Sequence, residues 1–478
     1  MASPYPPISI GGPGGDYRYR PSNLDDVENV ENYVEGVYHP VSIGDTLANG
    51  RYKLIHKLGF GGSSTVWLAR DQQPDSTTPD AASLVALKVM AAHFSDRPPS
   101  AMQELLVPEK LHALFSESRH PVKDHIHRIH RHFTETGPNG THLCLVAPFC
   151  GPSLLAVADN LSYRYHRRIE GRVARRLAKQ AALVIERMHS AGMVHGGSCF
   201  DVSVRPILTQ CLFRNFTDIT TSNMLFRLKE SVQAMSDDAI CAQLGEPVTE
   251  EVITASGDPP GPDAPRELVE SIQASRFIEF SLVHDSILVS DFGQSFLVDA
   301  MPEDYHPATT IHCTPPEVRF DQTISFASDV WMLACTLFEI RAGFSLFDSF
   351  LRSENLVWRQ AVEMLGKLPD PWWNQWDARK VWFAESDGEP KPEEVQKEEG
   401  VLLVARKCTI RDKLELIGKK EEPPRGKDWP MTEPDETVME EEEIKLLQDL
   451  LQKMLRYRPE ERISMAEVIQ HPWFNYKD

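Results

Sequence analysis

The sequence has no long hydrophobic run and no paired cysteines. The most apolar helical stretch, Val330–Phe338, is too short to cross a bilayer and ends at Glu339, which marks it as a core helix. The eight cysteines lack the spacing of a disulfide framework or a zinc ribbon. We therefore expect no membrane association, and reduced thiols in the cytoplasm or nucleus.

Basic residues are also in short supply. Residues 1–16 are rich in Gly, Pro and Ser, without the basic start and apolar core of a secretory signal, so no secretion is expected. Across the chain, 50 Lys and Arg stand against 70 Asp and Glu, a net charge of −20. Solubility alone can explain such an excess, but the field also repels nucleic acid and attracts arginine-rich proteins. Direct nucleic-acid binding is not expected.

After a short lead-in, the sequence divides into two regions with different hydrophobic periodicity. Residues 1–40 form a polar lead-in without a sustained period, which we treat as a flexible tail. Short runs rich in β-branched and aromatic residues follow at Tyr52–Ile55, Ser64–Leu68 and Leu84–Val89, separated by turns, and indicate an antiparallel sheet. Later segments have helical spacing, as at Val173, Leu177, Ala181, Val184 and Met188, and at Ile444, Leu447, Leu451 and Leu455. An α+β fold is predicted.

Two stretches in the second region look inserted, at 231–275 and 384–441, because they are dense in Pro, Gly and charge. We expect both to lie on the surface. Just before the second stretch, four tryptophans gather at 372, 373, 376 and 382. They could anchor a partner, but such clusters more often fill gaps between helices, and packing is the interpretation we favour.

A glycine-rich turn joins the first two strand-like runs, at Leu58–Leu68. Glycines let backbone amides approach a triphosphate, and Val66 would lie against an adenine ring. Ser64 stands where such a pattern usually has its third glycine. By itself the turn fits an ordinary hairpin equally well.

One lysine lies within the apolar run Val85–Lys88, and a lysine in such a setting needs a reason. Lys88 can grip α- and β-phosphates if a carboxylate holds it. Glu104 is the candidate carboxylate, Glu109 is its competitor, and Pro108 lies inside the helix expected there. The alternative is a strand-edge lysine that extends to water.

A carboxylate follows another apolar run: Asp291, in Asp291–Gly293, comes after Ser286–Val289. An aspartate at a strand end, with a glycine shortly after it, can hold Mg²⁺ across phosphate oxygens. The tripeptide alone is common. Its weight comes from the order of the motifs along the chain.

With these motifs in this order, the chain resembles a eukaryotic protein kinase of the SR-protein kinase type, fungal-looking in detail, over about residues 38–474. Gly59–Leu68 is similar to that family's glycine-rich loop, which also lacks the third glycine. Ala147 and Pro148 depart from the usual gatekeeper and hinge residues. Arg462 resembles the arginine that pairs in this family with the glutamate found here at Glu317. The further similar segments are Gly137–Val146, Pro315–Glu317, Asp329–Trp331 and Arg458–Ile463.

The resemblance implies a bilobal protein kinase fold, with a small β-rich N-lobe and a larger, mostly helical C-lobe. The kinase domain is expected at 41–475, with the N-lobe at 52–150, the C-lobe at 151–475, and insertions near 196–216, 231–275 and 384–441.

The catalytic loop of such kinases has His-x-Asp, four residues and then Asn. After His195 the nearest acid is Asp201, which has Pro206 where the Asn belongs. Asp218 is followed at the required spacing by Asn223. We therefore expect Asp218 to be the catalytic base and Asn223 to be a metal ligand.

Removing the 21 residues Gly196–Phe216 would join His195 to Thr217 and give an uninterrupted, family-like loop. The clean join favours the hypothesis that this segment is a translated intron or a gene-model error. If it is instead a true insertion, the domain can still fold, because long loops are cheap to close, whereas catalysis suffers from small displacements. Thr220, which stands where many such kinases have a lysine, would weaken activity further.

The function implied is transfer of the ATP γ-phosphoryl group to Ser or Thr of a protein, with arginine/serine-rich substrates, by a monomer. Lys88 and Glu104 would orient the phosphates, Asp218 would accept the hydroxyl proton, and Asn223 and Asp291 would hold Mg²⁺. The residues expected to contact ATP are Leu58, Gly59, Phe60, Gly61, Gly62, Ser63, Ser64, Val66, Ala86 and Lys88. The alternative is a pseudokinase or scaffold that binds basic protein segments without transferring phosphate.

Overall fold

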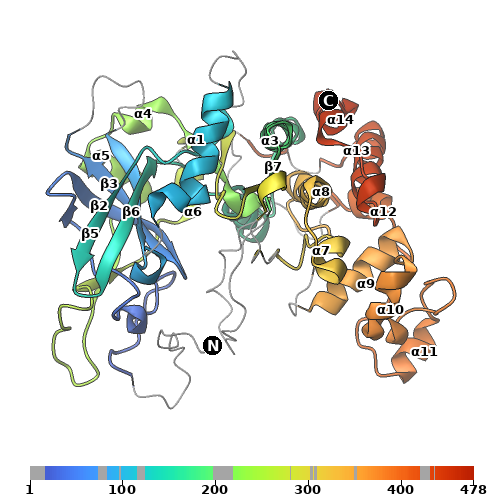
Figure 1. The fold of residues 1–478 in the computed structure, drawn as a ribbon, viewed down its shortest axis with the longest axis horizontal. Coiled ribbons are helices and arrows are strands. Elements are labelled where there is room, and N and C mark those ends of the chain that lie inside the picture. Colours follow the sequence, from blue (N-terminus) through green and yellow to red (C-terminus); the bar gives the residue numbers. More distant parts are fainter. Residues whose placement is uncertain are drawn as a thin grey trace.

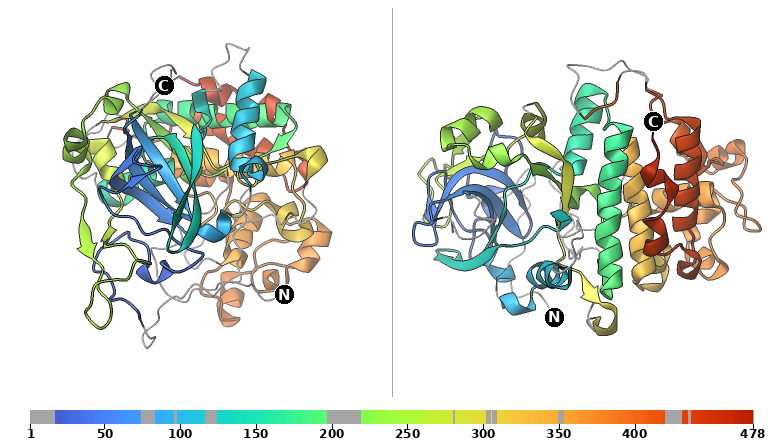
Figure 2. Two further views of the ribbon diagram at one scale, coloured as in Figure 1. Left: turned by 60° about the vertical axis from the view of Figure 1, so that its left-hand side comes forward. Right: turned by 90° about the horizontal axis from the view of Figure 1, so that it is seen from above.

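A computed structural model gives the fold in two parts, a β-rich part and a helical part (Figure 1). It describes residues 17–73, 83–95, 98–115, 124–196, 219–279, 281–301, 305, 309–348, 353–419, 431–434 and 437–477. The small part contains a six-stranded antiparallel sheet, and the large part contains most of the helices (Figure 2). The predicted α+β, bilobal protein kinase fold is confirmed.

The sheet of the small lobe has the strand order β1-β2-β3-β4-β6-β5. Its strands are β1 (Thr46–Leu47), β2 (Tyr52–Gly61), β3 (Ser64–Asp71), β4 (Leu84–Met90), β5 (Arg131–Gly137) and β6 (Gly140–Pro148). Each strand run expected from the sequence lies within β2, β3 or β4. Their alternating large apolar residues, among them Leu54, Trp67 and Leu87, are buried on one face.

Two small strand pairs lie where the lobes meet. β8 (Met224–Leu228) pairs with β11 (Val283–Val289), and β7 (Met193–Val194) pairs with β12 (Phe296–Leu297). A third pair joins β9 (Thr249–Glu251) to β10 (Glu267–Val269). The first two pairs bring the chain on either side of residues 197–218 close to the segment that follows β11.

The helical lobe is built around α3 (Gly171–Ser190), α8 (Phe326–Ala342) and α13 (Glu441–Met454), which pack side by side (Figure 2). The predicted apolar face of α3 is buried, and the helix ends just before Gly192, which has φ +72°. α8 is buried nearly all round, as its continuous apolar sequence predicts. The other helices are α1 (Gln103–Phe115), α2 (Leu154–Asp159), α4 (Glu230–Gln233), α5 (Asp237–Leu244), α6 (Ala274–Glu279), α7 (Pro316–Asp321), α9 (Glu354–Leu365), α10 (Asp370–Gln375), α11 (Glu393–Glu398), α12 (Ile410–Glu415) and α14 (Met465–Val468).

Residues 17–40, assigned to a flexible tail from the sequence, instead pack against the small lobe. Tyr19, Tyr33 and Tyr38 are buried in a cluster with Val252 and Leu268 of the stretch 231–275. That stretch therefore also contributes a core of its own, although it lies on the outside of the sheet (Figure 1). No period in the sequence signals this burial, because the segment has only a short 3₁₀ turn, Val30–Asn32, in otherwise irregular chain.

The second inserted stretch, expected on the surface, also contributes buried residues, among them Gln396, Ala405 and Ile417. In α12, Ile410 and Leu414 are buried, and this helix lies against α13. The four tryptophans before it, Trp372, Trp373, Trp376 and Trp382, are all buried, as the packing interpretation predicted. Trp373 and Trp376 meet edge to face with ring centroids 6.3 Å apart.

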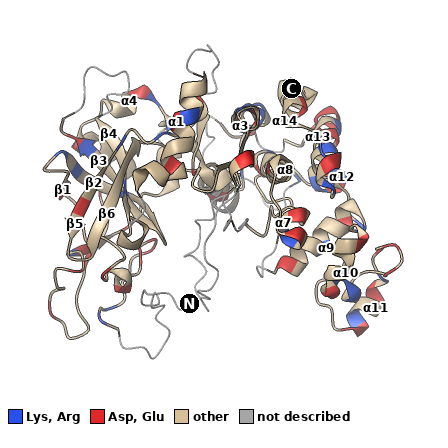
Figure 3. Ribbon diagram, in the orientation of Figure 1, with Lys and Arg blue, Asp and Glu red and all other residues tan. Residues whose placement is uncertain are grey.

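Charged residues of both signs are interspersed over the outer helices of the large lobe (Figure 3). No helix among the described residues combines the length and apolarity needed to cross a membrane.

Candidate active site

Lys88 and Glu104 meet across the small lobe. Lys88 is on β4, Glu104 is in the first turn of α1, and Lys88 Nζ donates to Glu104 Oε1 at 2.8 Å. Burial lowers the pKa of Lys88, but the carboxylates of Glu104 and Asp291 outweigh burial and raise it, so the lysine stays charged. Glu109, the competing candidate, is exposed, and α1 continues through Pro108.

Asp291 lies directly after β11 and faces the same pair of charges. Burial and the Glu104 carboxylate raise its pKa to about 6, against the lowering effect of Lys88. Its φ of +63° is uncommon for a residue with a Cβ and costs of order 1 kcal/mol or more. Backbone strain of this kind in a half-buried acid is typical of functional sites.

Asn223 lies beside Asp291 because the strands β8 and β11 are paired. Met224 is opposite Val289, and the carbonyl of Asn223 accepts hydrogen bonds from Ser290 N at 2.8 Å and Ser290 Oγ at 2.9 Å. The two predicted metal ligands therefore leave the same end of one strand pair.

The residues on either side of the interruption both attach to α8. His195 N and Gly196 N donate to the buried carboxylate of Asp329, at 2.8 and 3.2 Å. Two turns further along α8, Thr336 donates to the carbonyl of Ile219. Thr221 Oγ1 donates to Glu339 Oε2 at 2.6 Å. The predicted base Asp218, like the rejected Asp201, lies outside the described residues, so its position beside Ile219 is known only from the chain.

The glycine-rich hairpin is formed by β2 and β3, and β3 pairs with the strand that carries Lys88. Leu58–Gly61 belong to β2, Gly62 and Ser63 form the turn, and Ser64 opens β3. Val66 is opposite Lys88 in the β3–β4 ladder, and Ala86 is opposite Ala147 in the β4–β6 ladder. The predicted nucleotide residues thus occupy three adjacent strands.

The segment after Asp291 is fixed at both of its ends. Phe292 packs on His195 with ring centroids 5.6 Å apart, and Ser295 Oγ donates to the His195 carbonyl at 3.0 Å. At the far end, Arg462 donates from Nη1 and Nη2 to the two Glu317 oxygens at 2.7 Å each. The predicted Glu317–Arg462 pair is confirmed.

The sequence did not single out the anchoring roles of Asp329, Thr336 and Glu339. In the sequence, Asp329 only opens the similar segment Asp329–Trp331, next to the apolar run Val330–Phe338. A fully buried carboxylate in an apolar helix is a signal that could have suggested a partner, because unpaired buried charge is costly. Thr336 and Glu339 give no comparable signal.

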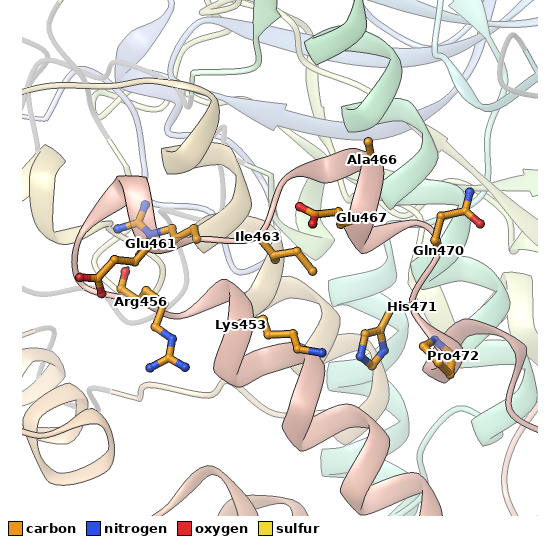
Figure 4. A pocket seen from close by; sticks show the side chains of 10 residues that line it. Lys453, Arg456, Glu461, Ile463, Ala466, Glu467, Gln470, His471 and Pro472 are labelled. Atoms are coloured by element: carbon orange, nitrogen blue, oxygen red, sulfur yellow. Dashed lines mark hydrogen bonds between the residues drawn. The ribbon is translucent and has the colours of Figure 1, made fainter.

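Two open hollows lie on the helical lobe, at a distance in sequence from these groups. The first, of about 730 Å³, is lined by Lys453, Arg456 and His471 among others (Figure 4). The second, of about 680 Å³, lies beside Arg411 and Gln448. Neither hollow is lined by Lys88, Glu104, Asn223 or Asp291, so neither is part of the candidate active site.

The donor set at the lobe junction fits a magnesium ion bound together with a nucleotide. Mg²⁺ prefers oxygen ligands and is usually held by one or two protein carboxylates plus substrate phosphates and waters. Asp291 and Asn223 supply a carboxylate and an amide oxygen, and Lys88 supplies a charge for the phosphates. No group of three His, Cys, Asp or Glu residues in the described part of the chain could hold a metal by itself.

Comparison with known proteins finds similarity to protein kinases. The protein kinase domain family matches residues 280–474. Serine/threonine-protein kinase SRPK of Physarum polycephalum is 24% identical over 456 residues, covering 93% of this chain and 91% of that protein. Protein kinase dsk1 of Schizosaccharomyces pombe is 33% identical over 171 residues, 35% of this chain and 29% of that protein. Human SRSF protein kinase 3 is 34% identical over 157 residues, 32% of this chain and 24% of that protein.

The chain thus spans nearly the whole length of the Physarum relative and less than a third of the other two. With a bilobal fold, a Lys88–Glu104 pair and Asp291 beside Asn223, the chain is similar to protein kinases of the SR-protein kinase type.

Proposed function

We propose that this protein transfers the γ-phosphoryl group of ATP to serine or threonine hydroxyls of proteins, with arginine/serine-rich segments as substrates. The observation that carries the proposal is the meeting of Lys88, Glu104 and Asp291 beside Asn223. Phosphoryl transfer needs little covalent chemistry from the protein, so positioned charges supply most of the catalysis.

Each group has a distinct part in this proposal. Lys88, held by Glu104, orients the α- and β-phosphates, while the hairpin Leu58–Ser64 covers them and Val66 and Ala86 line the adenine side. Asp291 and Asn223 hold Mg²⁺, which would neutralise charge on the phosphate oxygens. Asp218 accepts the proton of the attacking hydroxyl.

The similarity to SR-protein kinases supports arginine/serine-rich substrates, and the charge of the chain is compatible with them. A net charge of −20 attracts a basic segment, and attraction of opposite charge increases the rate of encounter more than the final affinity. We propose a monomer that acts in the cytoplasm or nucleus on protein, without direct contact to nucleic acid or membrane. Six described cysteines are free thiols, which suits a reducing compartment.

The test measures phosphate transfer from labelled Mg-ATP to three peptides: an arginine/serine repeat, a lysine/serine repeat of equal charge, and an arginine/tyrosine repeat. We expect transfer to the arginine/serine repeat to be fastest. Asp218→Asn should abolish it, and Asp201→Asn, the acid with the wrong spacing, is the matched control. If the wild-type chain binds the basic peptide but transfers nothing, the pseudokinase alternative holds instead.

A further inference from the structure

The N-terminal segment Glu28–Tyr38, called here the N-terminal brace, lies beside the glycine-rich hairpin. Gly36 and Val37 accept hydrogen bonds from His93 N at 2.8 Å and Ala92 N at 3.0 Å, just after β4. On the other side, Gly36 N donates to the carbonyl of Asn139 in the β5–β6 turn at 2.8 Å. The brace is therefore tied by its backbone to two places on the sheet.

Tyr38 connects the brace to the hairpin tip. Its hydroxyl donates to the carbonyl of Gly61 at 2.7 Å. The side chain is buried, and burial raises its pKa to about 12, so the hydroxyl remains a donor at neutral pH. Asn139 Nδ2 holds the Tyr38 carbonyl at 2.7 Å, which fixes the residue from its other end.

A buried ion pair makes the second connection. Lys57, on β2, is fully buried and pairs with Glu28 of the brace, whose carboxylate also accepts from the Tyr33 hydroxyl at 2.5 Å. The Lys57 ammonium lies 5.2 Å from the ring centroid of Phe60 in the hairpin. A cation at this distance from an aromatic face attracts it, and more so away from water. Burial lowers the pKa of Lys57 to about 7, against the raising effect of the Asp26 carboxylate, so the ammonium on which Phe60 packs needs the paired carboxylate of Glu28.

The sheet supports this hairpin mainly on one side, because β3 pairs with β4 from Ser64 to Arg70. β1 pairs with Tyr52 and Lys53, and Gly44 and Asp45 bond the backbone of Leu54. Among the described residues, the outer edge of β2 beyond Leu54 has no strand partner in the sheet. Ile272 N donates to the Lys57 carbonyl at 3.0 Å, so the stretch 231–275 covers part of this edge. Support from outside the sheet therefore acts on the β2 side of the hairpin. The N-terminal segment and the 231–275 stretch lie side by side against the sheet (Figures 1 and 2).

We propose that the N-terminal brace sets the position of the glycine-rich hairpin, and that Tyr38, Glu28 and Lys57 are positioning residues for the phosphates of ATP. The inference rests on the proposed function for its nucleotide. None of the three residues needs to touch ATP, because each acts through Gly61 or Phe60.

The first test is Tyr38→Phe, which removes only the hydroxyl that binds Gly61. Loss of one hydrogen bond predicts a rise in the KM for ATP of about 3- to 10-fold, with the KM for peptide unchanged. Amide hydrogen exchange at residues 58–64 should also become faster. Tyr52→Phe is the matched control, because Tyr52 lies on β2, the strand that contains Gly61, at the end far from the hairpin tip.

The second test uses the ion pair. Glu28→Gln leaves the Lys57 charge buried without its carboxylate and is expected to destabilise the small lobe. Glu28→Gln with Lys57→Met removes both charges and should restore the melting temperature but not the KM for ATP, since Phe60 still lacks its cation. A double variant with a wild-type KM would overturn the role of the pair.

The outcomes separate the brace from the proposed function. An unchanged KM for ATP in Tyr38→Phe, or an equal rise in Tyr52→Phe, overturns the proposal. If the wild-type chain binds no ATP, the proposed function fails, while hydrogen exchange of the hairpin still tests the brace. Equal rates of amide hydrogen exchange at residues 58–64 in Tyr38→Phe and wild type would then refute the role of the N-terminal brace.

Discussion

Glu104 and Glu109 provide a test, at the scale of single residues, of which carboxylate of α1 holds Lys88. Only Glu104 contacts the lysine, and Glu109 is exposed. We expect Glu104→Gln to lower kcat/KM for phosphate transfer by about 100-fold, because a misplaced catalytic group costs about that much. Glu109→Gln should stay close to wild type. Steady-state kinetics of both variants measure this, and equal losses would contradict the assignment.

The Glu317–Arg462 pair gives a stability prediction. Its side chains are 4% and 0% exposed, so Arg462→Met leaves a carboxylate buried without its guanidinium. Removing one partner of a buried pair costs about 3–5 kcal/mol of unfolding free energy. Urea denaturation should show that loss, and Arg458→Met, in the same segment but 55% exposed, should change stability by less than about 1 kcal/mol. Similar effects in the two variants would show that the pair adds nothing.

The site residues differ in how far the sequence could predict them. Lys88, Glu104, Asn223 and Asp291 stand in motifs with fixed spacing, and the structure brings them together as expected. Lys57 was not predicted, because its partner is 29 residues away in a segment without period. An ion pair between such positions leaves no trace in local sequence pattern.

At the scale of elements, the interrupted loop has ends that lie close together. His195 is bound to Asp329 and Ile219 to Thr336, seven positions apart in α8 and hence about 10 Å along its axis. Two residues between His195 and Ile219 give three Cα steps of about 3.8 Å, roughly 11 Å in all. Thr217 and Asp218 alone could therefore bridge the gap.

We predict that deleting Gly196–Phe216 preserves the fold and raises activity. Shortening the loop from 23 residues to two removes about three doublings of length, or roughly 2 kcal/mol of closure entropy. Transfer to an arginine/serine peptide should rise by about 100-fold, because Asp218 is then fixed between two anchored residues.

The controls for this deletion concern stability and the messenger. Gly196 has φ +90°, which Thr217 in its place avoids, so the chain direction after His195 must change locally. A melting temperature well below wild type would show that the segment is integral to the fold. A transcript that encodes Gly196–Phe216 would refute the hypothesis of a translated intron or gene-model error while leaving the deletion result to stand.

Elements with a clear period were predictable, and those without one were not. α3, α13 and the strands β2 to β4 follow the apolar spacing of their sequences. Residues 17–40 have mixed polar and aromatic sequence, and they become buried where they meet the stretch 231–275 and the sheet of the small lobe. Burial that depends on two irregular segments meeting is not encoded in either segment alone.

At the scale of the whole molecule, buried neutral histidines make stability depend on pH. His39 and His56 are 8% and 5% exposed, and burial lowers the pKa of each to about 4. In the unfolded chain both would bind a proton near pH 6.5. Between about pH 6.5 and 4 the unfolded state therefore binds more protons, and stability falls as pH falls, by about 1.4 kcal/mol per pH unit for each histidine. Above pH 6.5 their contribution is constant.

Urea denaturation at pH 7, 6 and 5 measures this dependence. Because paired carboxylates also lose stability in acid, the informative quantity is the difference between variants. Between pH 6.5 and 5, His56→Asn should reduce the slope of the unfolding free energy against pH by the contribution of one proton. His284→Gln is the matched control, since the side chain of His284 is 59% exposed. If the slope is the same in both variants, His56 binds its proton as readily in the folded protein as in the unfolded chain. Burial then does not keep His56 neutral.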